Sequence, residues 1–166
     1  MRAAFAAMGL ALLAGRAGAQ DTVRAEVRTM IAQAHHPWAR RPDFPRYVDV
    51  LARLYASRGD APVWIAGGRL SSAGVAAVSE LGAAAGQGLT PADYDAPTLA
   101  GLARGYPHRS WNALALARFD LLLSLDLIRY LDDLRAGRVR APFRQSRAPP
   151  GLDLAAGVAA AVAGDS

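Results

Sequence analysis

Few side chains in this 166-residue chain could do chemistry, and none of them stands in a recognisable catalytic pattern. The chain has no cysteine, which removes thiol nucleophiles and cysteine-based metal sites. A serine or threonine nucleophile needs a positioned base, and none of the three histidines lies in such a context. Zinc-binding His–Glu motifs, phosphate-cradling loops and calcium-loop spacings are also missing from the sequence. The sequence therefore predicts no catalytic residue, no cofactor and no metal site.

Two pairs of polar residues have plainer explanations than a functional site. The adjacent His35 and His36 point in different directions on a helix, and no carboxylates follow at ligand spacing. A favourable position at a helix C-terminus is preferred to metal binding. Asp93 and Asp95 resemble the carboxylate pair of a glycosidase, but one local pair does not define a cleft. Capping of a helix that begins at Thr90 explains Asp93 without any site.

The tryptophans and arginines raise the question of a glycan or nucleic-acid partner. Trp64 lies in a short extended run, 62–65, where a large aromatic side chain usually fills the core. We therefore predict that Trp64 is a core residue and not a sugar-stacking platform. Arginines cluster only beyond residue 134, without regular aromatic interleaving, so a solvated charged segment is predicted and no nucleic-acid partner.

A long helix over 110–137 must position whatever the chain contains. Ser110 is a suitable N-cap, Gly137 a suitable C-terminal stop, and the two rows of apolar residues between them indicate neighbours on more than one side. Charged residues such as Asp120 and Arg129 interrupt the run and argue against a membrane span. The segment is predicted to be a buried core helix.

Shorter helices are predicted around this one. Apolar periodicity and turn signals place them at 22–34, 46–57, from Ser71 or Ser72 to about 85, at 97–104 and, rich in alanine, at 152–163. In the third of these, Val75, Val78 and Leu81 are expected to face inward. The sequence thus predicts an all-α (mainly α) fold, a small helical bundle around one long central helix. It contains at most one short strand or hairpin, closed by the turn Gly67-Gly68.

The first nineteen residues read as a secretory signal peptide. A basic start precedes a short apolar segment and a small-x-small cleavage pattern, which predicts cleavage between Ala19 and Gln20. Export to the periplasm and no membrane attachment after cleavage are expected. Loss of Arg2 and Arg16 with the leader would lower the formal charge from +5 to +3, which is ordinary.

Several sequence blocks, taken in order, resemble the N-terminal scaffold domain of large, multi-domain murein L,D-transpeptidases. The paired signals "x-P-x-W…G-G-R-L-S" and "G-L-T-P-A-D-Y" lie about 20 residues apart and are specific in combination. Further matches lie in the long helix, and the likeness covers roughly 46–139. The residues carrying it include Tyr55, Trp64, Gly68, Arg69, Leu70, Thr90, Pro91, Asp93, Tyr94, Asp120, Asp126, Arg129, Tyr130, Asp133, Gly137 and Arg138.

The resemblance implies a helical scaffold over 20–140, followed at 141–166 by a Pro/Ala-rich linker or the start of another segment. In that family a peptidoglycan-binding module and a catalytic domain accompany the scaffold, and the catalytic domain carries a Cys nucleophile. No such cysteine exists here, so the chain is expected to be no enzyme by itself. Whether it is a fragment or a natural short form is left open.

We therefore expect the non-catalytic scaffold portion of an exported enzyme of peptidoglycan crosslinking and cell-wall remodelling. Its expected partners are the catalytic and peptidoglycan-binding modules of the parent protein, and peptidoglycan itself is a further candidate. The alternative is a stand-alone periplasmic peptidoglycan-binding or adaptor protein, with Trp38, Trp64 and Trp111 contacting glycan. A carboxylate-based lytic enzyme is the third hypothesis.

Overall fold

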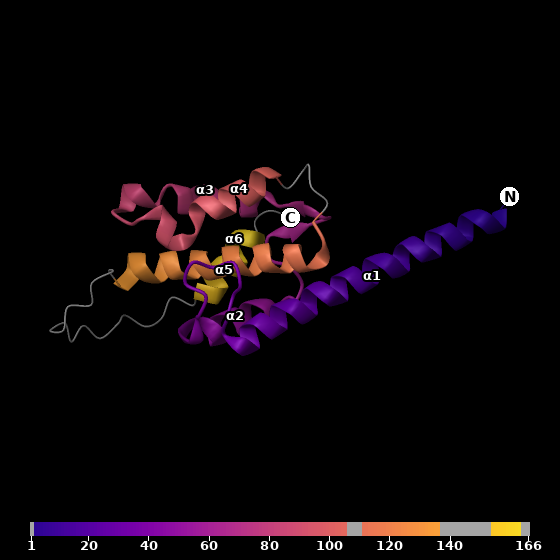
Figure 1. The fold of residues 1–166 in the computed structure, drawn as a ribbon, viewed down its shortest axis with the longest axis horizontal. Coiled ribbons are helices and arrows are strands. Elements are labelled where there is room, and N and C mark those ends of the chain that lie inside the picture. Colours follow the sequence, from indigo (N-terminus) through magenta and orange to yellow (C-terminus); the bar gives the residue numbers. More distant parts are fainter. Residues whose placement is uncertain (1, 106–110, 137–153, 164–166) are drawn as a thin grey trace.

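The computed structural model describes residues 2–105, 111–136 and 154–163, and within them the fold is a bundle of helices around α5 (Figure 1). Their secondary structure is mainly α-helical, and one antiparallel hairpin accompanies the helices, as predicted. The helices are α1 (Arg2–Gln33), α2 (Val48–Ala56), α3 (Ser72–Gly82), α4 (Ala96–Gly105), α5 (Ala113–Ala136) and α6 (Leu154–Ala163). The strands are β1 (Ile65–Ala66) and β2 (Arg69–Leu70), and the 3-10 turns are η1 (Pro45–Tyr47), η2 (Ala84–Gln87) and η3 (Pro91–Tyr94).

Helix α5 is the predicted central helix, with a different start. The Oδ1 atom of Asn112 accepts the N–H of Ala115 at 2.8 Å and so caps the first turn. The predicted cap, Ser110, lies outside the described residues and is not needed for this role. Every residue from Phe119 to Tyr130 is buried. A helix buried around its whole circumference has neighbours on all sides, which confirms the prediction of a core helix.

The other helices surround α5 (Figure 1). Helix α1 packs along one side of α5, α3 and α4 pack along the other, and α6 lies against α2. The N-terminal half of α1 projects away from the bundle, and the helix passes without a break through the predicted cleavage point after Ala19. Ala155, Val158 and Val162 of α6 are buried against the core. The signal peptide at residues 1–19 and the domain boundary at residue 140 both stay predictions.

The hairpin of β1 and β2 connects the extended run predicted at 62–65 to α3. Gly67 and Gly68 both have positive φ, as a two-residue hairpin turn requires, and Ile65 pairs with Leu70. The hydroxyl of Ser71 accepts the N–H of Gly74 and caps α3. The prediction that Val75 faces inward is wrong. It is 56% exposed, because it borders an open pocket between the hairpin and α4.

Helix α2 is shorter than predicted, because Pro45 starts a separate 3-10 turn before it. Its inner face is formed by Leu51, Leu54 and Tyr55, which are buried. Val78 and Leu81 of α3 are buried as predicted. These side chains belong to one continuous core that α5 runs through.

Candidate functional site

His36 is a buried structural residue. Its Nε2 lies 2.8 Å from the backbone oxygen of Arg118 on α5, and its Nδ1 accepts the N–H of Trp38 at 3.2 Å. The two bonds together require a neutral ring with its proton on Nε2. Burial lowers the pKa of His36 to about 4, so the ring stays neutral at physiological pH. Both ring nitrogens are thus occupied, and neither is directed at a ligand.

The predicted role of the histidines at a helix C-terminus is wrong. Helix α1 ends at Gln33, and Ala34 takes a left-handed conformation with φ of 50° that turns the chain. His35 therefore lies beyond the helix, where its Nδ1 is 2.9 Å from Oδ1 of Asp43. The sequence reading failed because a proline after a helix limits its end but does not fix it.

Asp93 and Asp95 are both engaged by Arg40. The backbone N–H of Arg40 donates to Oδ2 of Asp95 at 2.9 Å, and its guanidinium lies 4.0 Å from Asp93. Asp95 is buried. The side chain of Thr90 makes no capping hydrogen bond, so the predicted hydroxyl cap is wrong, although Pro91 does open the turn η3. The two carboxylates tie the loop at Arg40 to η3, and this contact accounts for both.

Trp64 is the predicted core residue and belongs to a buried polar cluster. Its indole N–H donates to Oγ of Ser124 at 2.9 Å, and its backbone N–H donates to Oδ1 of Asp120 at 2.8 Å. Oδ2 of Asp120 accepts the N–H of Val63 at 2.9 Å and the hydroxyl of Tyr55 at 2.7 Å. Burial raises the pKa of Asp120 to about 6, and these donors limit the rise. We call Tyr55, Val63, Trp64, Asp120 and Ser124 the α5 anchor.

A second buried polar contact lies one to two turns along α5. The guanidinium of Arg129 donates to Oδ1 of Asp126 at 3.1 Å and to the backbone oxygens of Arg41 and Asp43 at 2.7 and 3.3 Å. Oδ2 of Asp126 has no hydrogen-bond partner among the described residues. Burial raises the pKa of Asp126 above its usual value in spite of the neighbouring guanidinium. The pair fixes the loop after α1 to α5.

Two hydrogen bonds between a tyrosine hydroxyl and a carboxylate join other elements to the C-terminal end of α5. Tyr94 of η3 donates to Asp133 at 2.8 Å, and Tyr130 donates to Glu80 of α3 at 2.7 Å. The rings of Tyr94 and Tyr130 meet edge to face, with centroids 5.5 Å apart. These contacts hold η3 and α3 on the same side of α5.

Asp132 pairs with Arg46 at 2.8 Å and accepts the hydroxyl of Tyr47 at 3.1 Å. Both partners lie in η1, so this carboxylate joins η1 to α5.

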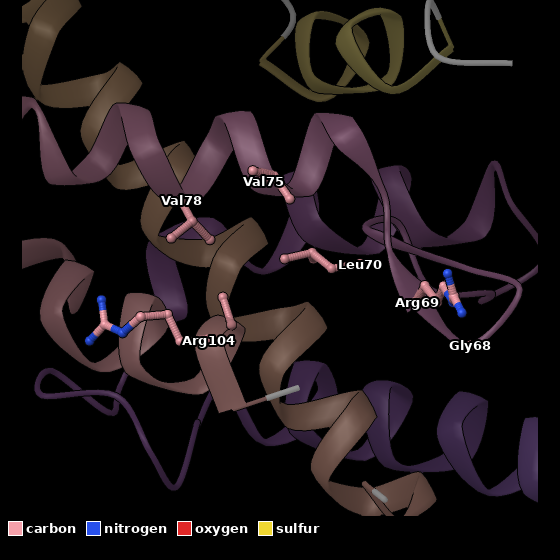
Figure 2. A pocket seen from close by; sticks show the side chains of 7 residues that line it. Gly68, Arg69, Leu70, Val75, Val78 and Arg104 are labelled. Atoms are coloured by element: carbon pink, nitrogen blue, oxygen red, sulfur yellow. The ribbon is translucent and has the colours of Figure 1, made fainter. Parts of the chain in front are cut away.

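An open pocket of about 590 Å³ lies between the hairpin, α3 and α4 (Figure 2). Leu70, Val75, Val78 and Ala103 supply its apolar walls. Its remaining lining residues are Gly68, Arg69 and Arg104. Gly68, Arg69 and Leu70 were singled out from the sequence as one motif block, and the fold places all three at this pocket.

Comparison with known proteins supplies one match, to a family. The family described as Scaffold domain matches residues 49–166. The chain belongs to the scaffold-domain family of L,D-transpeptidases. No curated protein and no solved structure matches the chain.

Several residues of the motif blocks make the buried contacts that join the elements of this scaffold domain to α5. Trp64 lies in the α5 anchor, Tyr94 and Tyr130 meet beside α5, and Arg129 holds the loop after α1. Gly137 and Arg138 lie outside the described residues. In the sequence, Asp120 stands in a motif block and interrupts an apolar run, but these features did not predict its role as a buried hydrogen-bond acceptor. A lone charge in the middle of a strongly apolar helix was the available signal.

Two further findings concern the described part of the scaffold domain. No group of three or more potential ligand residues is arranged for a metal ion among the described residues. Within the same residues, each helix is too short or too polar to span a lipid bilayer.

Proposed function

We propose that the chain is the scaffold portion of an exported murein L,D-transpeptidase and takes part in peptidoglycan crosslinking through packing alone. Its work is to support and position a catalytic domain and a wall-binding module of the parent protein. The family match over residues 49–166 carries this proposal. The missing cysteine supports a non-catalytic role, because the chain lacks the nucleophile that the family's catalytic domain uses.

The internal contacts of the domain support a positioning role. Buried polar contacts join α5 to α2, to the hairpin and to the loop after α1. A shift of these elements would break the contacts. Each buried polar group left unpaired would then cost roughly 1–3 kcal/mol of stability. A body built in this way transmits orientation between modules attached to it.

The test of the non-catalytic role uses the purified chain and isolated muropeptides. After incubation, chromatography and mass spectrometry should detect no 3→3 crosslinked dimer. A dimer that forms in proportion to the amount of chain would refute the proposal.

Export is tested by fusing residues 1–30 to a phosphatase that is active only outside the cytoplasm. We propose that the fusion is active, and that replacing the two alanines of the cleavage pattern, Ala17 and Ala19, leaves the precursor uncleaved. Cytoplasmic retention of the unmodified fusion would contradict export.

Retention on purified sacculi tests the alternative of a wall-binding protein. Trp64 is 1% exposed, so it cannot stack on glycan without opening the core. Trp38 and Trp111 are half-buried and stay candidates for such a contact. We expect no retention of the chain. Tight retention that Trp111→Ala or Trp38→Ala abolishes would favour the adaptor function.

A further inference from the structure

The pocket between the hairpin, α3 and α4 is a large feature that the packing of the described elements leaves unused. Its volume of about 590 Å³ falls in the range of small-ligand and peptide pockets, roughly 300–1,000 Å³. The side chain at its mouth, Val75, is the most exposed large hydrophobic residue among those described. An aliphatic surface left open in this way favours an apolar occupant.

The charges that the described residues bring to this pocket have a single sign. Among these residues, Arg69 of β2 and Arg104 of α4 are the charged ones in the lining, and both are exposed. Neither guanidinium has a hydrogen bond or an ion pair with the described residues. Elsewhere in the fold arginines do find carboxylates, as Arg46 and Arg118 do. The two free guanidinium groups favour an anionic occupant, since each can bind a carboxylate with two hydrogen bonds.

The arrangement of these groups defines the occupant further. Figure 2 shows Arg104 and Arg69 at opposite ends of a row of aliphatic side chains formed by Val78, Val75 and Leu70. An occupant that satisfies all of them has an apolar centre and a negative charge on either side.

We propose that this pocket, which we call the arginine-flanked pocket, binds a short acidic segment of a partner protein, with a branched aliphatic side chain between two carboxylates. The branched side chain fills the space between the hairpin and α4, and the carboxylates bind Arg69 and Arg104. The mostly aliphatic walls favour a branched aliphatic side chain of a protein segment. This inference goes beyond the proposed scaffold role and does not depend on the activity of the parent enzyme.

The test is fluorescence anisotropy with a labelled synthetic peptide that carries a leucine between two glutamates. We expect saturable binding that weakens as salt is raised, because the ion pairs are exposed. Arg69→Gln and Arg104→Gln should each weaken binding about fivefold, since an exposed ion pair contributes up to about 1 kcal/mol. Val75→Asp should weaken it more strongly, because it places a carboxylate at the mouth of the pocket.

Arg53→Gln is the matched control. Arg53 is exposed on α2, away from the pocket, and the substitution removes the same charge. Binding by this variant should equal that of the unmodified chain. Peptides with serine in place of leucine, or with glutamines in place of the glutamates, should bind more weakly. Circular dichroism of each variant checks that the fold is intact.

Three results would overturn the proposal. One is equal loss of binding in Arg53→Gln and Arg104→Gln, which would mean attraction by net charge alone. Another is a muropeptide that displaces the labelled peptide at lower concentration than the unlabelled peptide does, which would assign the pocket to the wall. The third is a dimer in sedimentation experiments that Val75→Asp dissociates, which would assign it to a second copy of the chain. A 3→3 dimer in the muropeptide crosslinking assay would refute the proposed scaffold role and would leave this inference untouched.

Discussion

The clearest test of how this fold is held together is the substitution Tyr55→Phe. The hydroxyl of Tyr55 is fully buried, donates to Oδ2 of Asp120 at 2.7 Å and lies 3.0 Å from Oγ of Ser124. Phenylalanine keeps the ring and removes only this hydroxyl. The substitution removes the hydrogen bonds to Asp120 and to Ser124. Asp120 keeps two backbone N–H donors, from Val63 and Trp64, so its carboxylate is not left unpaired.

The expected loss follows from burial and charge. Hydrogen bonds to charged groups contribute about 1.5–3 kcal/mol, so Tyr55→Phe should lower the free energy of unfolding by about 2 kcal/mol. Tyr47→Phe is the matched control, because its hydroxyl also donates to a carboxylate, that of Asp132, at 3.1 Å. Tyr47 is only half-buried and Asp132 keeps Arg46 as a partner. Its loss should be about 0.5 kcal/mol.

The measurement is urea unfolding followed by circular dichroism at several pH values. Burial raises the pKa of Asp120 to about 6 in the fold. The stability that its protonated form contributes is therefore fully present below about pH 4 and is lost as pH rises through 6. The Tyr55 bond favours the ionised form, since bonds to a charged acceptor are roughly twice as strong. The loss in Tyr55→Phe should therefore be larger at pH 8 than at pH 4. Equal losses in the two tyrosine variants, or a loss that does not depend on pH, would refute this account of the α5 anchor.

Five further substitutions test other parts of the fold. His36→Gln should destabilise the chain by about 1–2 kcal/mol at pH 8. The difference in the free energy of unfolding between this variant and the unmodified chain should shrink as pH falls from 6.5 to 4. Burial lowers the pKa of His36 from 6.5 to about 4, so the unmodified chain loses the stability contributed by the neutral ring over this range. Gly101→Ala should raise the melting temperature, since an added Cβ meets nothing within 4 Å and alanine favours the helix by up to about 1 kcal/mol. Gly74→Ala should lower it, because its Cβ would come within 2.5 Å of a leucine of β2. Val78→Ala should cost about 2 kcal/mol and Val75→Ala less than about 0.5 in urea unfolding, since only the first is buried.

Local signals in the sequence predicted most of the helices. The cap and periodicity that place α3 and the apolar periodicity that places α5 act over a few residues, so they can be read from neighbouring positions. The turn at Gly67-Gly68 is local as well and gave the hairpin correctly. Val75 was misplaced for the opposite reason. Its spacing fits the inner face of α3, but burial depends on whether another element covers that face, and none of the described elements does.

The polar contacts of the core were beyond prediction because each joins residues far apart in the sequence. Asp120 binds backbone groups of Val63 and Trp64, which lie more than fifty positions earlier, and nothing in either segment specifies the other. A carboxylate buried in an apolar helix without hydrogen-bond donors lowers the stability of the fold by about 1–3 kcal/mol or more. Its presence therefore predicts a donor but does not identify that donor.

The polar contacts of the core give a physical role to residues in the sequence blocks that carry the family resemblance. Trp64, Asp120 and Arg129 lie in separate blocks of the sequence, yet each ends in a buried contact with another segment. These three residues of the blocks therefore fix other segments of the chain to α5. Arg69 is the exception within its block, since it contributes to no such contact among the described residues and borders the arginine-flanked pocket instead. A motif residue that the packing does not use is the one whose partner should be sought outside the chain.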